Sequence, residues 1–524
     1  MSFNLSQDFK KFRDFDSKLQ SWRVSEIFEF LIIFGFVLAV RASLIFPFNY
    51  SNDTYFYLIY PQNANLELFA KEMRIFGYGI ICGLDFFGAV YPYAGSMWQI
   101  AFCAALSFVG VMLRKIWIPE ASSLPSITTG VLFALFPYHS DYLSYHNAAP
   151  GFISTLILGI LGMYFSGRGP MFLILSALAL VYAMGNQILF GYFFLILLFG
   201  AFHLGFGLLK HNLQTTNQTF LELKSLFFKF GLLVACTFSY LLLSRLVMMV
   251  FGIESGGRLE FSTLTDFPDK VDLYLKNSYY FLLRGEATMP FGVKALQLGI
   301  LAMVLPPIFI SVFFNSAKRF ITIICGLVLF VLLVCAIGAC MGVVLPIKTA
   351  RSEMMLRVLS AISVYWAGVF ALTWSLNNGL ARSLCVYFGL FLAIAYAFNT
   401  NRHSADFARI NQRDRLTASR MVERLVNLPE FSKMRTVAFV NDNWEGNFGK
   451  ISTQTGSFNV SPMFRSWANT AILCEVSGLK LEFPSTPDRE IAKNAAVGKP
   501  EWPAPRSVFI EGDVGVVVLP KGEK

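Results

Sequence analysis

The chain has 524 residues, of which 55% are hydrophobic and only 15% are charged, and its formal net charge is +10. So large an apolar fraction excludes an ordinary soluble domain, because there would be too little polar surface to cover it. The Lys and Arg residues lie in short segments beside apolar stretches, where they orient a protein in the bilayer, so the positive charge implies no nucleic-acid partner. The composition predicts a mainly α-helical, polytopic membrane protein.

The first 24 residues form a polar segment with Lys10, Lys11, Arg13, Lys18 and Arg23. Positive charge ahead of the first apolar stretch predicts a cytoplasmic N-terminus for this segment, 1–24. The stretch Glu26–Phe46 is expected to be a retained first helix and not a cleaved signal peptide, because it starts late and no small-residue cleavage site follows it.

The next apolar stretch, Ile75–Val90, contains Asp85 and is too short for a span, which needs about 20 largely apolar residues. We therefore expect it to lie along the outer surface or to re-enter without crossing. The helix Gly95–Leu113 then runs inward and places Arg114 and Lys115 in the cytoplasm, where such pairs belong.

The later apolar stretches complete a transmembrane domain over residues 25–399, with about eleven crossings in all and an external C-terminus. The remaining spans are predicted at Thr128–Tyr138, Phe152–Phe165, Met171–Gly185, Phe190–Leu209, Leu232–Phe251, Phe291–Phe314, Ile321–Val344, Val358–Leu376 and Cys385–Phe398. Lys224 and Lys229 are expected in a cytoplasmic loop.

Residues 400–524 have a different, polar composition and predict a small external α/β domain. Ala405–Leu428 shows the spacing of a helix with one apolar stripe, and a second helix is predicted within Phe464–Cys474. Three short strands are predicted at Thr436–Val440, Ser507–Ile510 and Val516–Leu519, with a turn at Asp513-Val514-Gly515. This domain shows no catalytic motif that we recognise.

A lone acid, Asp53, follows the first helix within Ser51-Asn52-Asp53. A carboxylate just outside the first span can meet both a lipid-borne phosphate and a water-borne hydroxyl, so Asp53 is the candidate general base. The alternative interpretation is a solvated turn, because Asn-Asp is favourable turn chemistry after a helix.

Lys and Arg usually gather on the cytoplasmic side of a membrane protein, so a basic cluster on the outer side suggests a specific role. Binding an anionic lipid phosphate would be such a role, since Arg donates two hydrogen bonds to phosphate oxygens and Lys provides a point charge. The alternative is an ion pair with Glu353 or with acids of the outer loop 252–290. The cluster consists of Lys348, Arg351 and Arg357, joined by Arg74.

Further polar residues are expected in a short outer loop that contains His139, Asp141 and His146. Asp141 and His146 are candidate substrate contacts, while either His is more typical of a packed or water-bonded side chain than of a metal ligand. Arg41 and Arg245 lie in the outer halves of their helices and are expected to extend to the interface, or to join the phosphate site. We find no ligand set for a divalent metal.

The order of these features resembles the serotype-converting O-antigen glucosyltransferases, a family of the GT-C class that uses polyprenyl-phosphate sugars. The resemblance is diffuse and covers nearly the whole chain. It is carried by Asn52-Asp53, Arg74, Phe136-Pro137, Tyr142-Leu143-Ser144-Tyr145, Gly185-Asn186-Gln187, Ala405–Leu428, Val437-Ala438-Phe439-Val440 and Trp502-Pro503. In such families an acidic pair occupies the first site, whereas here its first member is Asn52, which leaves one carboxylate.

The resemblance implies an inverting hexosyltransferase, with glucose as the expected sugar, in the bacterial inner membrane with a periplasmic C-terminal domain. It implies a polyprenyl-phosphate-linked donor, a surface polysaccharide or lipid-linked glycan as acceptor, no cofactor, and a small membrane flippase and a donor synthase as partners. Asn52 would then contact substrate beside the base Asp53. Two other classes stay open from the residues alone: a lipid or polysaccharide transporter or flippase, and a membrane-anchored binding or sensory protein.

Overall fold

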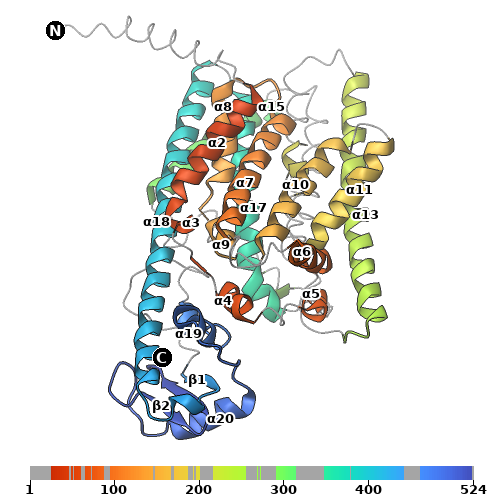
Figure 1. Ribbon diagram of the computed structural model, residues 1–524. Coiled ribbons are helices and arrows are strands. Elements are labelled where there is room, and N and C mark those ends of the chain that lie inside the picture. The colour runs from red at the N-terminus through yellow and green to blue at the C-terminus, as the bar shows by residue number, and fades with distance from the viewer. Residues whose placement is uncertain are drawn as a thin grey trace, which may run out of the picture.

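In the computed structural model of the protein, mostly helical segments form a bundle, and a small sheet lies beyond one end of it (Figure 1). The structure describes residues 25–46, 49–50, 52–60, 65–71, 74–87, 95–137, 139–145, 148–166, 170–186, 193, 196–200, 216–254, 268–269, 272, 291–313, 347–377, 379–441 and 461–521. The predicted span Ile321–Val344 and most of Phe190–Leu209 lie outside these residues.

The helical part comprises long apolar helices and several shorter ones. Their bounds are α2 Glu26–Val40, α3 Ala42–Ile45, α4 Asn52–Ile59, α5 Leu66–Lys71, α6 Ile75–Phe86, α7 Gly95–Trp117, α8 Ser123–Ala134, α9 His139–Ser144, α10 Ala149–Phe165, α11 Pro170–Asn186, α13 Thr216–Val250, α15 Phe291–Phe313, α17 Ile347–Leu376 and α18 Gly379–Val426. Within the described residues, three helices are long and apolar enough to cross a membrane, namely α7, the Lys224–Val250 part of α13, and α18. These helices are compatible with a membrane protein.

Three helices extend beyond the apolar stretches that predicted them. α13 begins at Thr216, so Lys224 and Lys229 lie on a helix and not in a loop, which corrects the prediction. α17 likewise begins at Ile347, before the predicted span, and α18 continues without a break past Thr400, where the composition changes. Hydropathy marks only the apolar part of a helix, whereas the backbone hydrogen bonds continue wherever the residues allow them.

Two ion pairs join the start of α2 to the end of α7. The guanidinium of Arg114 donates to both carboxylate oxygens of Glu29 at 3.0 Å, and both side chains are buried. Next to this pair, Lys115 Nζ lies 2.5 Å from the carboxylate of Glu26 in a more exposed position. The beginning of α2 and the end of α7 therefore lie at the same end of the bundle, which agrees with a short α6 that adds no crossing between them.

Two glycines allow α7 and α8 to approach closely. A Cβ atom added to Gly110 would lie only 2.8 Å from the Cα atom of Gly130, so no larger residue fits there without a shift of backbone. Small residues at such a crossing are common between membrane helices, because association there depends on close packing.

The C-terminal unit, defined as α18 from Ala405 onward with residues 427–441 and 461–521, has a small mixed sheet. Its strands β1 (Thr436–Val440), β2 (Val508–Glu511) and β3 (Val514–Val518) lie in the order β1-β3-β2, with β3 parallel to β1 and antiparallel to β2. The predicted strands are therefore confirmed, but the hairpin turns at Gly512, whose φ is +65°, so Val514 and Gly515 already belong to β3.

Helices and short turns cover the sheet of this unit. They are η6 (Phe431–Lys433), η8 (Pro462–Phe464), α19 (Asn469–Ser477) and α20 (Thr486–Ala495). The predicted helix within Phe464–Cys474 corresponds to η8 and α19, which starts five residues later than expected because residues 465–468 form turns. Figure 1 shows α18 running from the bundle into this unit as one continuous helix.

Candidate functional site

The two predicted residues of the acidic motif open α4. Asn52 and Asp53 form its first turn, while α3 has already ended at Ile45. Asp53 is therefore a few residues beyond the first helix, as expected, but the interpretation of this stretch as a solvated turn is wrong, because residues 52–59 are helical. The structure describes the backbone of these two residues and not their side chains. Figure 1 shows α4 between the bundle and the C-terminal unit.

One buried amide of α18 holds the start of the α4 segment. The side-chain oxygen Oδ1 of Asn411 accepts a hydrogen bond from the backbone N–H of Tyr50 at 2.9 Å and another from the hydroxyl of Tyr55 at 3.1 Å. Its Nδ2 donates to the carbonyl oxygen of Phe407 at 3.4 Å. Asn411 and Tyr55 are both fully buried, so losing either bond would leave a polar atom without water to replace it.

The rest of α4 packs into the core of the C-terminal unit. The ring of Phe56 lies edge to face with that of Phe483, with centroids 5.3 Å apart, and the hydroxyl of Tyr60 donates to the carbonyl oxygen of Leu481 at 3.1 Å. Aromatic pairs of this kind stabilise a contact beyond the area that they bury. The apolar core shared with α4 includes Met421, Leu425, Val437, Phe464, Ile472 and Leu473.

A charged pair borders the same contact. The guanidinium of Arg415 lies 3.2 Å from the carboxylate of Glu475 and 5.5 Å from the ring centroid of Tyr50. Burial raises the pKa of Glu475, and Arg415 opposes that rise. Burial also raises the pKa of Tyr55, which keeps its hydroxyl protonated and able to donate to Asn411.

Asp414, one turn from Asn411 along α18, is a buried carboxyl that the sequence did not single out. It accepts a hydrogen bond from the hydroxyl of Ser461 at 2.7 Å and one from the backbone N–H of Met463 at 3.4 Å. Burial raises its pKa to about 7, although both donors and the charge of Arg413 lower it. This group therefore changes charge near neutral pH.

Arg74, the second predicted element of the site, precedes α6 and is half-buried. Its backbone N–H donates to the carbonyl oxygen of Phe69 at 2.7 Å. α6 is 12 residues long, so it measures about 18 Å and is shorter than the hydrocarbon core of a bilayer. It packs on α10 and α11, whereas α4 packs on the C-terminal unit, so the helices next to Arg74 and Asp53 are held by different parts of the molecule.

The three remaining cations of the basic cluster lie on the first turns of α17 and not in a loop. At 100° per residue, positions 348 and 351 share a face of this helix, whereas position 357 lies opposite position 348. Lys348 and Arg351 can therefore act together more readily than either can with Arg357. Their side chains, and the alternative ion pair with Glu353, lie outside the described residues.

The predicted outer loop contains the short helix α9. Asp141 lies on this helix, and its side chain and all of His146 lie outside the described residues. His139 is fully buried, and its ring lies edge to face with Phe133 at 5.1 Å and with Phe136 at 6.2 Å. Burial lowers its pKa to about 3, helped by the charge of Arg41. The interpretation of His139 as a packed side chain is confirmed.

Arg41 corrects a prediction, because it does not extend to the membrane interface. Its side chain is fully buried at the break between α2 and α3, where Nη2 donates to the carbonyl oxygens of Ala134 at 2.8 Å and Phe136 at 3.5 Å. Those carbonyls end α8 and carry its partial negative charge, which attracts a cation. Nε and Nη1 of Arg41 find no partner among the residues that the structure describes. Arg245 lies half-buried on α13.

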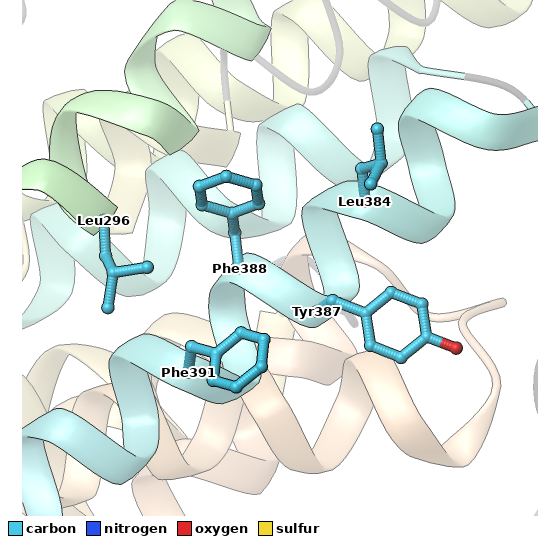
Figure 2. Close-up of a pocket in the computed structure, with 5 residues that line it drawn as sticks. All are labelled: Leu296, Leu384, Tyr387, Phe388 and Phe391. Carbon is cyan, nitrogen blue, oxygen red and sulfur yellow. The ribbon is translucent and has the colours of Figure 1, made fainter.

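Two pockets lie along α18. An apolar pocket of about 340 Å³ lies between α15 and α18 and is lined by Leu296, Leu384, Tyr387, Phe388 and Phe391, with the Tyr387 ring at its edge (Figure 2). A larger groove of about 700 Å³ follows the outer face of α18 in the C-terminal unit. Its lining includes Arg413, Arg420, Glu423, Arg424 and Trp502, so it carries excess positive charge.

The comparisons with known proteins add no relative, since no protein-family model, curated protein or solved structure matches the chain. Within the described residues, no three His, Cys, Asp or Glu side chains come together in a group that could hold a metal ion.

The sequence did contain a signal for the residues that we missed. Asn411 and Asp414 occupy positions within the apolar stripe of the Ala405–Leu428 helix, next to Phe407, Ile410 and Ala418, all of them buried. A polar residue at a core-facing helical position requires a partner, because burial without one is costly. That pattern predicts a buried polar contact, but it does not say that the partner is α4.

Proposed function

We propose that this protein is a GT-C-type inverting glycosyltransferase that transfers a hexose, glucose in the resembled family, from a polyprenyl-phosphate donor to a cell-surface polysaccharide or lipid-linked glycan. The observation that carries the proposal is the placement of α4. The helix that begins with Asn52 and Asp53 is held at the end of the bundle by buried contacts to the C-terminal unit. A site at that level can take one substrate from the bilayer and another from water.

In this proposal Asp53 accepts the proton of the acceptor hydroxyl while that oxygen attacks C1 of the sugar. The bond from C1 to the phosphate oxygen breaks, and the lipid phosphate leaves with its charge, so it needs cations and no proton. Arg74, Lys348 and Arg351 would bind that phosphate, with Arg357 in a lesser role because it lies on the opposite face of α17. Asn52, Asp141 and His146 would contact the sugars.

The apolar pocket supports a lipid-linked donor. Its lining has no charged side chain, and the two helices that form it, α15 and α18, belong to the apolar bundle. Phe391 at this pocket precedes Thr400 by nine residues on α18, which is about 13 Å of helix, and the hydroxyl of Thr400 donates to the carbonyl oxygen of Leu135 beside Arg41 and α9. An isoprenoid chain in the pocket would thus extend toward the proposed site.

The setting in this proposal is the bacterial inner membrane, with the N-terminus in the cytoplasm and the C-terminal unit in the periplasm. A small flippase and a donor synthase would supply the lipid-linked sugar. A transporter or flippase activity for this chain remains the alternative, and it would move the lipid-linked sugar across the bilayer without breaking the bond at C1.

Transfer from a radiolabelled polyprenyl-phosphate glucose by the purified protein in liposomes, with lipopolysaccharide as acceptor, tests the proposal. The variant Asp53→Asn keeps the shape and removes the basicity, so transfer should fall by about a hundredfold or more while donor binding is kept. Asn52→Asp restores an acidic pair and should not reduce transfer. Near-parental transfer by Asp53→Asn would remove Asp53 as the base. Donor movement across the liposome without any sugar transfer would favour the flippase.

A further inference from the structure

α4 is short and does not pack as an ordinary helix of the bundle. It has eight residues, and isolated helices of that length are marginal in water, so its position depends on tertiary contacts. It packs on α19 and η8 of the C-terminal unit and on side chains that α18 presents. The segment that carries Asn52 and Asp53 is thus held in place by the far end of the chain.

The polar part of that contact is specific. Tyr50 and Tyr55 both donate to one oxygen, Oδ1 of Asn411, and they lie on either side of Asn52 and Asp53 in the chain. The two tyrosine rings also meet edge to face at 5.2 Å. Because the bonds precede and follow the first turn of α4, they determine where that turn begins and how it is rotated. An apolar contact alone would hold the helix but would permit small rotations.

We propose that Asn411 is a positioning residue and that the C-terminal unit serves to hold the first turn of α4 in place. This inference rests on the proposed function for its catalytic consequence, whereas its structural consequence stands without it. A positioned first turn fixes the backbone of residues 52 and 53. A displacement of about 1 Å in a catalytic group is enough to slow a reaction substantially while substrate binding persists.

The same helix provides a matched control. Asn399 lies three turns earlier on α18, is buried, and donates to the carbonyl oxygen of Ala395, the residue four positions before it, as Asn411 does to Phe407. This hydrogen bond of Asn399 stays within α18. Asn411→Leu and Asn399→Leu therefore make the same chemical change at comparable buried sites, and Asn411→Leu alone removes the acceptor of the Tyr50 and Tyr55 bonds.

Amide hydrogen exchange of the full chain in detergent tests the structural part. In Asn411→Leu, the amides of residues 52–60 should exchange at least about tenfold faster, because the bonds to Tyr50 and Tyr55 are lost, while β1 and β3 keep their protection. Tyr55→Phe removes one of the bonds and should give a smaller increase, and it replaces Asn411→Leu if that variant does not fold. Asn399→Leu should match the parent. Parental exchange of residues 52–60 in both Asn411→Leu and Tyr55→Phe would overturn the proposal.

Transfer kinetics test the catalytic part. Asn411→Leu should lower kcat by about tenfold and change the donor KM by less than about twofold, because the base is misplaced while the donor site is intact. Asn411→Asp keeps an oxygen that accepts both bonds and should restore part of kcat. Faster exchange with unchanged kcat would overturn the positioning role and leave the proposed function standing. A parent protein without transfer activity would contradict the proposed function, and the exchange result would remain valid.

Discussion

A buried arginine lies at each end of α2, and the two arginines have different hydrogen-bond partners. At the start of α2, Arg114 is bonded to both carboxylate oxygens of Glu29, so the buried charges cancel. At the end of α2, the hydrogen bonds that Arg41 makes to the described residues go to backbone carbonyls. Farther along α18, in the C-terminal unit, the buried carboxyl of Asp414 accepts from a hydroxyl and an N–H group. The buried arginine at the start of α2 is paired with a full negative charge, whereas the one at the end of α2 is paired with the partial charges of backbone carbonyls.

The difference indicates where a charged ligand can be accommodated. A bidentate ion pair satisfies its own groups and leaves little for a substrate, so the α2–α7 end is structural. Carbonyl groups offset a cation only in part, so the buried charge of Arg41 is less fully compensated than that of Arg114. The helix α4, which contains Asp53, and α6, which follows Arg74, lie toward the Arg41 end of α2 (Figure 1).

The largest expected effect is at the ion pair. Arg114→Ala leaves the buried carboxylate of Glu29 without its cation, and removing one partner of a buried pair costs about 3–5 kcal/mol. Chemical denaturation of the purified protein in detergent should report that loss. The double variant Glu29→Gln with Arg114→Met removes both charges and should recover much of the stability. If the double variant is as unstable as Arg114→Ala, packing and not charge maintains this end of the bundle.

The C-terminal unit, which holds α4, should show a stability that depends on pH. Asp414 lies in the C-terminal unit beyond the apolar part of α18, and its pKa of about 7 in the folded protein lies above the unfolded value. Because the folded state binds the proton more tightly, this contribution is fully present below about pH 4 and is lost as pH rises through about 7. Stability should fall by about 2–3 kcal/mol between about pH 5 and about pH 8.

Asp414→Asn provides the control for that pH dependence. The amide cannot ionise, so the variant should show a much flatter profile and should be more stable than the parent at about pH 8. Glu475 also has a raised pKa and would leave a small slope in both proteins. Parallel profiles for parent and variant would show that Asp414 stays charged in the folded state.

The extent to which the sequence predicted the fold differs between these regions. The strands of the C-terminal unit were predicted to within a few residues, because short runs rich in β-branched residues are a local signal, although the turn between the last two was placed too late. The short α6 was also recognisable, since its length alone excludes a span. The sequence did not predict that α17 and α18 continue as helices into polar sequence. Hydropathy reports membrane contact and does not report where the backbone hydrogen bonds of a helix end.

The candidate site was predicted only in part. Asp53 and Arg74 were selected because charge is rare next to apolar stretches, and the structure places them in the first turn of α4 and just before α6. The partner of α4 was not found, since Tyr50 and Asn411 are 361 residues apart and no local pattern pairs them. Arg41 was misplaced for a related reason, because a lone Arg near a helix end fits both an interface position and a buried cap.

The smallest expected effect is at Lys115. Its ion pair joins the same two helices as the Arg114 pair, so the two pairs differ mainly in exposure. Lys115 follows Arg114 in the chain and Glu26 lies three residues before Glu29, but 25% of the Lys115 side chain and 51% of the Glu26 side chain are exposed. Exposed pairs contribute about 0.2–1 kcal/mol, because solvent screens the attraction and two long side chains lose freedom. Lys115→Ala should therefore change denaturation far less than Arg114→Ala, and 0.5 M salt should reduce even that difference, since the Debye length is then only about 4 Å. Equal losses for the two variants would mean that the end of α7 depends on its total charge and not on the buried bidentate contact.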